Sequence, residues 1–139
     1  MPDCTFCSIV AGDHAAHVVA DADETVAFLD VRPVFHGHTL VVPKAHVVTL
    51  PDLATASLEP LFTAVQRVAR AVVDGLGADG SFVAVNNVVS QSVAHLHVHV
   101  VPRRRKDGLR GFFWPRTTYD SDEQMTDVAT RLRAALRGV

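Results

Sequence analysis

Apolar residues follow two spacings along the chain, and each spacing predicts a different kind of element. Between residues 58 and 76 they recur every three or four positions, which predicts a long amphipathic helix. Elsewhere short runs rich in valine, phenylalanine and threonine alternate with polar turns, which is typical of strands. These predicted strands cover residues 18–19, 26–29, 38–43, 81–86 and 95–101.

A second helical pattern closes the chain. Ser121 and Gln124 have the spacing of a capping box, and apolar residues follow at helical intervals, so we expect a helix over 121–137. Residues 103–120 show no period and predict a long loop. Strands, a long helix, more strands and a closing helix are the order of an α+β fold with a mainly antiparallel sheet. From a length of 139 residues we expect a single domain spanning 1–139.

Composition and charge narrow the classes of protein further. With 48% hydrophobic and 20% charged residues, the chain resembles folded domains rather than disordered ones. A net charge of −2 gives no general attraction to nucleic acid or to an anionic membrane. No apolar run approaches the roughly 18 residues of a membrane span, and Asp3 stands where a signal peptide carries positive charge. We therefore expect a cytoplasmic protein with neither a membrane nor a specific nucleic acid as partner.

Three histidines occupy alternate positions of an apolar run. On a strand, His95, His97 and His99 would project from one face, about 6 to 7 Å from one to the next. A lone buried histidine usually has a structural role, but three in register favour a functional one. They can bind a metal, or one neutral imidazole can act as nucleophile or base. The spacing alone leaves both uses open.

The segments around these histidines carry a family resemblance. FLDVRPVFHGHTLVVPKAH and FVAVNNVVSQSVAHLHVHVVPR resemble the histidine triad (HIT) family of nucleotide hydrolases and transferases, and residues 95–101 match its histidine pattern throughout. The resemblance covers residues 4–103. It implies a HIT-like α+β fold, a homodimer whose strands join into one sheet, and a purine nucleotide or nucleotide derivative as ligand. It also implies hydrolysis or nucleotidyl transfer at the α-phosphorus of a dinucleoside polyphosphate, a nucleoside phosphoramidate or an adenylate.

The resemblance implies roles for individual residues. His97 is the implied nucleophile, which forms a nucleotidyl-histidine intermediate. The implied catalytic set comprises His38, which orients the triad, Ser92 and His99, which contact the phosphate, and His97. Asp30 is implied to bind the ribose hydroxyls, since a carboxylate accepts two hydroxyl hydrogen bonds. The implied nucleotide-binding set comprises Phe28, Asp30, Asn86, Gln91, Ser92, His97 and His99.

Two cysteines, Cys4 and Cys7, have the CxxC spacing of a metal site or a redox pair. On their own they are a weak zinc signal, because a structural zinc site needs four ligands. HIT members with this motif complete the site with the histidine after Pro-Lys-Ala and the first triad histidine, here His46 and His95. The resemblance thus implies a structural zinc ion, with a reduced thiol pair or a redox dithiol as the alternatives.

Some features depart from the family pattern or leave their role open. The loop at 87–91 is about two residues shorter than usual and has Ser90 where glycine is typical, although glycine lets backbone N–H groups approach a phosphate. A nucleotide-binding sensor or partner protein with little turnover is therefore one alternative, and a metalloenzyme with a catalytic metal on the histidines is another. The basic run at 103–106 is either a solvated loop or a phosphate-attracting segment. Trp114 packs on the core, closes the site or contacts a second chain.

Overall fold

The computed structural model of the protein describes residues 3–110 and 115–138. Its contacts divide the chain into two units, Met1–Asp107 and Gly108–Val139, which are described separately. The helices are α1 (Thr5–Ala11), α2 (Leu58–Leu76) and α3 (Asp122–Arg137), with short 3₁₀ turns at Leu50–Asp52 and Thr55–Ser57. The strands are β1 (Val18–Asp21), β2 (Thr25–Leu29), β3 (Thr39–Pro43), β4 (Gly80–Ala84) and β5 (Val98–Arg103).

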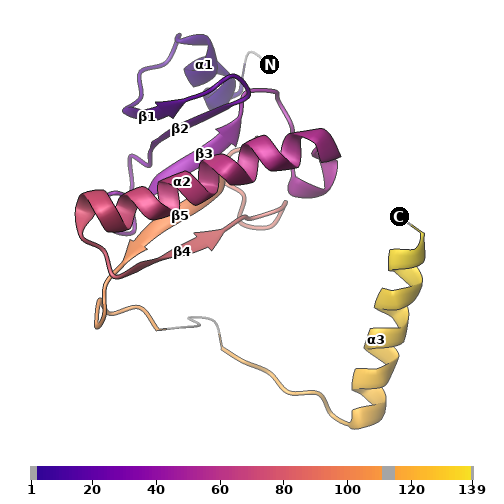
Figure 1. Ribbon diagram of the computed structural model, residues 1–139. Helices are drawn as coiled ribbons and strands as arrows, with labels where there is room; N and C mark the ends of the chain where they lie inside the picture. The colour runs from indigo at the N-terminus through magenta and orange to yellow at the C-terminus, as the bar shows by residue number, and fades with distance from the viewer. Residues whose placement is uncertain (1–2, 111–114, 139) are drawn as a thin grey trace. The chain divides into compact units, whose positions relative to one another are not determined.

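The first unit is built on a five-stranded sheet in the order β1-β2-β3-β5-β4, in which every neighbouring pair is antiparallel. The predicted long helix, α2, lies across one face of this sheet (Figure 1). Burying one valine or leucine side chain in the core stabilises a fold by about 1.5–3 kcal/mol. The core between helix and sheet contains Ala27, Val41, Leu61, Val65, Val68, Val72, Leu96, Val98 and Val100.

A second apolar cluster packs on the opposite face of the sheet. Cys4 and Phe6, at the start of α1, lie there against Val26 and Phe28 of β2 and against β3. Successive residues of a strand point to opposite faces, so Ala27, between them, belongs to the core under α2. Both faces of the inner strands are therefore buried, which accounts for their nearly continuous apolar sequences.

The last predicted strand begins later than expected. The sequence predicts a strand over 95–101, but β5 starts at Val98. Continuing the β3–β5 register would place Leu96 opposite Pro43, and proline has no N–H to give to the ladder. Leu96 donates instead to the carbonyl of Val47 at 2.7 Å. The predicted start is thus wrong because a proline on the neighbouring strand ends the pairing.

The short helix α1 is not predicted from the sequence, because seven residues are too few to show a period. Cys4 is its N-cap, and the Sγ of Cys4 accepts a hydrogen bond from the N–H of Cys7 at 3.4 Å. Gly12 ends the helix with a φ of 81°, a left-handed conformation that glycine adopts without steric cost. This helix brings both cysteines to the edge of the second apolar cluster.

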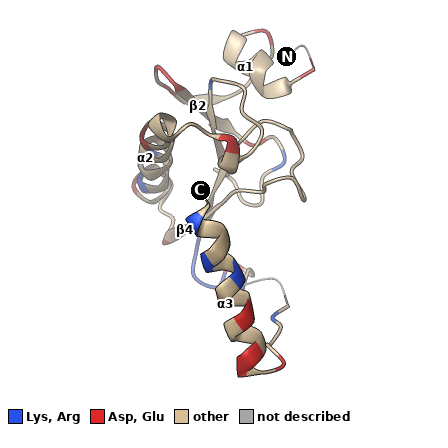
Figure 2. Cartoon of the chain, turned by 90° about the vertical axis from the view of Figure 1, so that its right-hand side faces the viewer, with Lys and Arg blue, Asp and Glu red and all other residues tan. Residues whose placement is uncertain are grey.

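The second unit contains α3, where the sequence predicts the closing helix. The Oγ of Ser121 accepts from the N–H of Gln124 at 3.0 Å, while the Gln124 side chain accepts from Asp120 rather than from Ser121. Acidic residues in the first turn and a basic residue in the last turn suit the helix dipole (Figure 2).

Between β5 and α3 the described residues form neither helix nor strand, and Trp114 lies outside the described residues. Nothing in the part of the chain that the structure describes is a helix both long and apolar enough to cross a membrane. The expectation of one domain over 1–139 stays a prediction.

Candidate functional site

The pairing of β3 with β5 brings four histidines together. Leu40 lies opposite His99, and His38 comes just before β3. The ring centroids of His97 and His99 are 5.0 Å apart, and those of His38 and His99 are 5.2 Å apart. His38, His95 and His97 are buried, and His99 is partly buried. The structure thus places His97 and His99 side by side, as the alternation predicts.

The protonation of His97 follows from the group that its ring meets. Nδ1 lies 2.7 Å from the main-chain oxygen of His95. A carbonyl oxygen only accepts hydrogen bonds, so Nδ1 carries the proton and donates it. In the neutral ring Nε2 then holds a lone pair. This nitrogen can act as a nucleophile or a base.

A chain of hydrogen bonds sets the tautomers of His38 and His99 in the same way. The N–H of Val34 donates to Nδ1 of His38 at 3.1 Å, which leaves the proton of the neutral ring on Nε2. That nitrogen lies 2.9 Å from Nδ1 of His99 and donates to it. The neutral His99 ring therefore carries its own proton on Nε2. The ring beside that of His97 thus carries an N–H on its Nε2.

Burial keeps the rings of His38 and His99 neutral. The pKa of His99 is lowered to about 4, mainly by burial and also by His97 and His38, against an opposing effect of Asp30. The pKa of His38 is also lowered, again mainly by burial and against the attraction of Asp30. At pH 7 His99 therefore offers a hydrogen bond rather than a positive charge.

The family resemblance implies that Asp30 contacts the ribose and Phe28 the base of a nucleotide. In the structure these two residues lie in different surroundings. Oδ1 of Asp30 accepts from the N–H of Arg32 at 2.9 Å, and Oδ2 lies 3.6 Å from Nε2 of His38. The Asp30 side chain is 21% exposed, so a ligand can reach it. Phe28 is buried, with its ring edge-on to Phe6 at 5.3 Å. The structure brings Asp30 to the histidines and leaves Phe28 in the core.

The loop between β4 and β5 contains the other implied nucleotide contacts. Nε2 of Gln91 donates to the carbonyl of Val48 at 2.6 Å, and Oε1 accepts from the N–H of Val88 at 3.0 Å. Both ends of the carboxamide are thus engaged, and Gln91 braces the loop. Asn86 is partly buried at one end of the loop, and Ser92 is exposed at the other.

Two residues of this loop adopt the left-handed backbone conformation. Val88 has a φ of 71° and Ser90 a φ of 61°. A β-branched residue is rare in this region, and the conformation costs a side-chain-bearing residue about 1–2 kcal/mol. The backbone thus takes up a glycine-like conformation although no glycine lies between Asn86 and Gln91.

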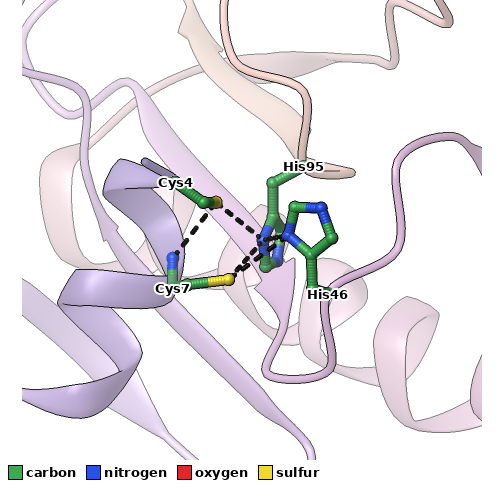
Figure 3. Close-up of side chains that lie close together, drawn as sticks. All are labelled: Cys4, Cys7, His46 and His95. Atoms are coloured by element: carbon green, nitrogen blue, oxygen red, sulfur yellow. Dashed lines mark hydrogen bonds between the residues drawn. The ribbon is translucent and has the colours of Figure 1, made fainter. Parts of the chain in front are cut away.

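Cys4, Cys7, His46 and His95 point toward one another in Figure 3, and we call them the cysteine–histidine cluster. Nδ1 of His46 lies 3.2 Å from Nδ1 of His95 and 3.2 Å from Sγ of Cys7. Nδ1 of His95 lies 3.4 Å from Sγ of Cys4 and 3.5 Å from Sγ of Cys7. Nε2 of His95 donates to the carbonyl of Pro43 at 2.8 Å, so Nδ1 presents a lone pair to the cluster.

This donor set fits a zinc ion. With Zn–N bonds of about 2.0–2.1 Å and Zn–S bonds of about 2.3 Å, the edges of a tetrahedron measure about 3.3–3.8 Å, close to the four distances above. Burial, and then the hydrogen bond and charge of Cys4, raise the pKa of the Cys7 thiol. A divalent cation would reverse this effect by favouring the thiolate. The pKa of His95 is lowered, chiefly by burial, which suits a neutral imidazole ligand.

Asp30, His38 and His99 form a second group of potential metal ligands, but their hydrogen bonds oppose this use. The N–H of Val34 takes Nδ1 of His38, whose Nε2 carries the proton donated to His99. A metal at this place would need the lone pair that the proton occupies. The arrangement favours hydrogen-bond donation over coordination and argues against the metalloenzyme alternative.

The basic run at 103–106 begins at the last residue of β5 and forms a hydrogen bond to the last residue of α2. Arg103 pairs with Asp107 at 2.6 Å, and Nη2 of Arg104 donates to the carbonyl of Leu76 at 2.8 Å. Along β5, Arg103 follows the last triad histidine by about 13 Å at the usual rise per residue. Arg103 and Arg104 are thus engaged within the fold, while the choice between a solvated loop and a phosphate-attracting segment for the run stays a prediction.

Phe6 is a residue at the site that the sequence analysis does not single out. Its buried ring lies edge-on to His97 at 5.1 Å and to His95 at 5.9 Å. Its place between the two cysteines is the only signal that the sequence offers for it. The contact with His97 joins segments far apart in the chain, so no local spacing predicts it.

Comparison with known sequences decides the family. The sequence model of the HIT domain matches residues 11–106. The chain belongs to the HIT family. A HIT-like protein of Mycobacterium tuberculosis is 40% identical over 108 residues, covering 76% of this HIT chain and 75% of the relative. The adenosine 5′-monophosphoramidase hnt1 of Schizosaccharomyces pombe is 32% identical over 122 residues, covering 86% and 89%. The adenylylsulfatase HINT3 of Arabidopsis thaliana is 32% identical over 109 residues, covering 77% of this chain and 55% of that protein.

Solved structures share the fold of this HIT chain. The protein SMU.412c from Streptococcus mutans has a TM-score of 0.87 at 33% identity, covering 98% of this chain and 87% of its own. A zinc-bound histidine triad family protein from Mycobacterium smegmatis has a TM-score of 0.74 at 37% identity, covering 96% and 98%. The predicted α+β fold of the HIT type, with a mainly antiparallel sheet, is confirmed.

Replacing Val88 by glycine should stabilise this HIT protein, because a left-handed backbone then no longer strains a β-branched side chain. We expect the free energy of unfolding to rise by about 0.5–1 kcal/mol after allowing for the greater entropy of unfolded glycine. Val89→Gly is the matched control, since this exposed neighbour has no positive φ, and it should lower the free energy of unfolding by about 0.5–1 kcal/mol. Urea denaturation measures both, and equal effects would contradict strain at Val88.

The free energy of unfolding should also decrease as the pH is lowered, because His99 then becomes protonated. The pKa is about 4 in the folded protein and 6.5 as the ordinary value, so between these values the unfolded chain binds more protons. The contribution is complete above pH 6.5 and is lost as the pH falls toward 4. His99→Gln removes this titration, and urea unfolding across the window should then show a flatter slope of stability against pH. His36→Gln, at an exposed histidine, should keep the wild-type slope, and a wild-type slope in His99→Gln would contradict the assignment.

Proposed function

We propose that this HIT protein hydrolyses or transfers at the α-phosphorus of nucleoside phosphate derivatives through a nucleotidyl-histidine at His97. One observation carries the proposal. The carbonyl of His95 accepts the Nδ1 proton of His97 at 2.7 Å, which leaves the lone pair on Nε2, and the centroid of the His99 ring, with its own proton on Nε2, lies 5.0 Å away. Two relatives are named as a monophosphoramidase and an adenylylsulfatase. Nucleoside phosphoramidates and adenylates therefore come first among the substrates, ahead of dinucleoside polyphosphates.

In the proposed reaction Nε2 of His97 attacks the α-phosphorus. A P–N bond forms, and the bond from phosphorus to the leaving group breaks with its electron pair. Nδ1 keeps its proton and donates it in a hydrogen bond to the carbonyl of His95. The dipole of this carbonyl stabilises the positive charge that develops on the ring. His99, with its tautomer set by His38, donates its Nε2–H to a phosphate oxygen or to the leaving atom. Water or another acceptor then attacks phosphorus, the P–N bond breaks with its electron pair returning to Nε2, and the proton of the acceptor passes to solvent.

The proposed nucleotide contacts combine direct and supporting residues. The carboxylate of Asp30 binds the ribose hydroxyls, and Ser92 donates to a phosphate oxygen from the exposed end of the loop. Asn86 contacts the nucleotide from the other end of that loop. Gln91 holds the loop in shape, since both ends of its side chain are already engaged. Phe28 supports the base pocket from the core.

The alternative of a nucleotide-binding protein with little turnover is less well supported. Its basis is the lack of glycine in the loop before the triad. Val88 and Ser90 nevertheless adopt left-handed conformations without glycine. The lack of glycine therefore does not remove this backbone shape, although the N–H groups of Val88, Val89 and Gln91 already donate hydrogen bonds within the loop.

We also propose that the cysteine–histidine cluster holds a structural zinc ion. The support is the fit of its four donors to a tetrahedron and the zinc-bound family protein of Mycobacterium smegmatis. Bound zinc would cross-link α1 to the sheet and neutralise the thiolates. The chemistry at phosphorus stays with the triad. A site with reduced thiols suits the cytoplasm.

A homodimer completes the proposal. β4 is an edge strand of the sheet, and a further strand can be added at such an edge. On the neighbouring helix α2, Phe62, Val73 and Leu76 are 39%, 39% and 49% exposed. A second copy paired along β4 would extend the sheet and cover this apolar surface.

His97→Gln should reduce turnover of adenosine 5′-phosphoramidate by a factor on the order of 10³ or more, because glutamine supplies no nucleophilic nitrogen. Mass spectrometry of reactions quenched with denaturant at alkaline pH, where the P–N bond survives, should detect a nucleotidyl adduct on the wild type and none on the variant. His36→Gln, at an exposed histidine, is the control and should turn over normally. Wild-type turnover by a folded His97→Gln protein would show that the nucleophile assignment is wrong.

The purified protein should contain about one zinc ion per chain, which elemental analysis measures. Cys4→Ser should lose the metal and lower the melting temperature, because a thiolate ligand and the cross-link it makes are removed. His97→Gln should keep the zinc. Metal retained in Cys4→Ser but lost in His97→Gln would instead indicate a catalytic metal on the triad.

A further inference from the structure

The cysteine–histidine cluster and the proposed nucleophile share one residue, His95. Its ring belongs to the cluster, with Nδ1 facing Cys4 and Cys7 and Nε2 donating to Pro43. Its main-chain oxygen accepts the Nδ1 proton of His97 at 2.7 Å. Any change that lets the His95 ring move therefore acts on the group that sets the tautomer of His97.

A second link runs through Phe6, which lies between the two cysteines in α1. Its ring is edge-on to His97, with centroids 5.1 Å apart and planes at 85°. It is also edge-on to His95 at 5.9 Å and to Phe28 at 5.3 Å. Phe6 is only 6% exposed. The ring of His97 is thus held by a hydrogen bond at Nδ1 and by an aromatic edge.

The position of Phe6 depends on the cluster. α1 has seven residues, and a helix of this length is not stable alone in water. It is attached to the sheet through its cysteines, which face His46 and His95, and through the apolar contacts of Phe6. When the cluster comes apart, the described residues of the helix keep the apolar contacts of Phe6, Ile9 and Val10 but lose the attachment through the cysteines.

We propose that Phe6 is a positioning residue for His97, and that the cysteine–histidine cluster holds both Phe6 and the carbonyl of His95 in place. This inference rests on the proposed nucleophilic role of His97. Phe6 restricts rotation of the ring while the carbonyl keeps the proton on Nδ1. Together they present Nε2 unprotonated and in one orientation, which is the arrangement that attack on phosphorus requires.

Nitrogen NMR tests the proposal without any substrate. Two-bond ¹H–¹⁵N correlation spectra at pH 8 report which ring nitrogen of His97 is protonated. The zinc-loaded wild type should show the Nδ1–H form alone, whereas Phe6→Leu and the wild type treated with a chelator should show both forms. Leucine keeps much of the apolar volume but has no aromatic edge. Val42→Ala, in the same apolar cluster but on β3, is the control and should keep the Nδ1–H form.

Kinetics with adenosine 5′-phosphoramidate separate positioning from binding. Phe6→Leu should lower kcat by about tenfold and change KM by less than about twofold, since the ground-state contacts of the nucleotide are intact. Val42→Ala should keep both within about twofold. A raised KM at unchanged kcat would assign Phe6 to nucleotide binding and overturn the positioning role. A single Nδ1–H form in both Phe6→Leu and the chelated protein would overturn it as well.

The experiments also distinguish this inference from the proposed function. If the zinc-loaded wild type turns over none of the nucleotide substrates, the proposed function fails, while the spectra still decide whether the cluster controls His97. If Phe6→Leu does not fold, the chelated wild type decides. Its His97 signals should return to the single Nδ1–H form when zinc is restored, and signals that never change on chelation would refute the coupling.

Discussion

The antiparallel pairing of β3 with β5 is the interaction on which the site depends. Both are inner strands, and their register puts Leu40 opposite His99. The same alignment brings His38 to the ring of His99 and the carbonyl of Pro43 to the ring of His95. A slip of one residue would turn every side chain of β5 to the other face and separate both groups of histidines at once. The register is held because each face of β3 is buried under its own apolar cluster and β5 buries Val98 and Val100 in the core under α2.

The same burial prepares the chemistry. Removal from water disfavours the charged imidazole and lowers the pKa of His38, His95 and His99. Neutral rings can stand side by side and exchange hydrogen bonds, where charged rings would repel one another. A nucleophile and a metal ligand both need a lone pair on nitrogen, so the neutral ring is the useful form. Apolar packing therefore stabilises the fold and keeps the lone pairs available.

The sequence predicts the elements that bury a continuous face, because their apolar residues keep a regular period. α2, β2 and β3 are of this kind, but α1 is too short and depends on its caps. The start of β5 could not be predicted from its own residues, since it is decided by Pro43 on the neighbouring strand. At the site, the alternation predicts that His97 and His99 lie together, and the family resemblance supplies their roles. The aromatic contact of Phe6 and the brace formed by Gln91 join distant segments, so they become visible only in the fold.

Chemically identical side chains take different parts at this site because each meets a different backbone group. The carbonyl of Pro43 takes the Nε2 proton of His95, which leaves the Nδ1 lone pair for the cysteines. The carbonyl of His95 takes the Nδ1 proton of His97, which leaves the lone pair on Nε2. The N–H of Val34 takes the Nδ1 lone pair of His38, which makes Nε2 a donor. The motif spacing brings the rings together, but the main chain selects the tautomer of each ring. The division of labour among the histidines is therefore a property of the backbone path, which is why a motif match alone does not establish it.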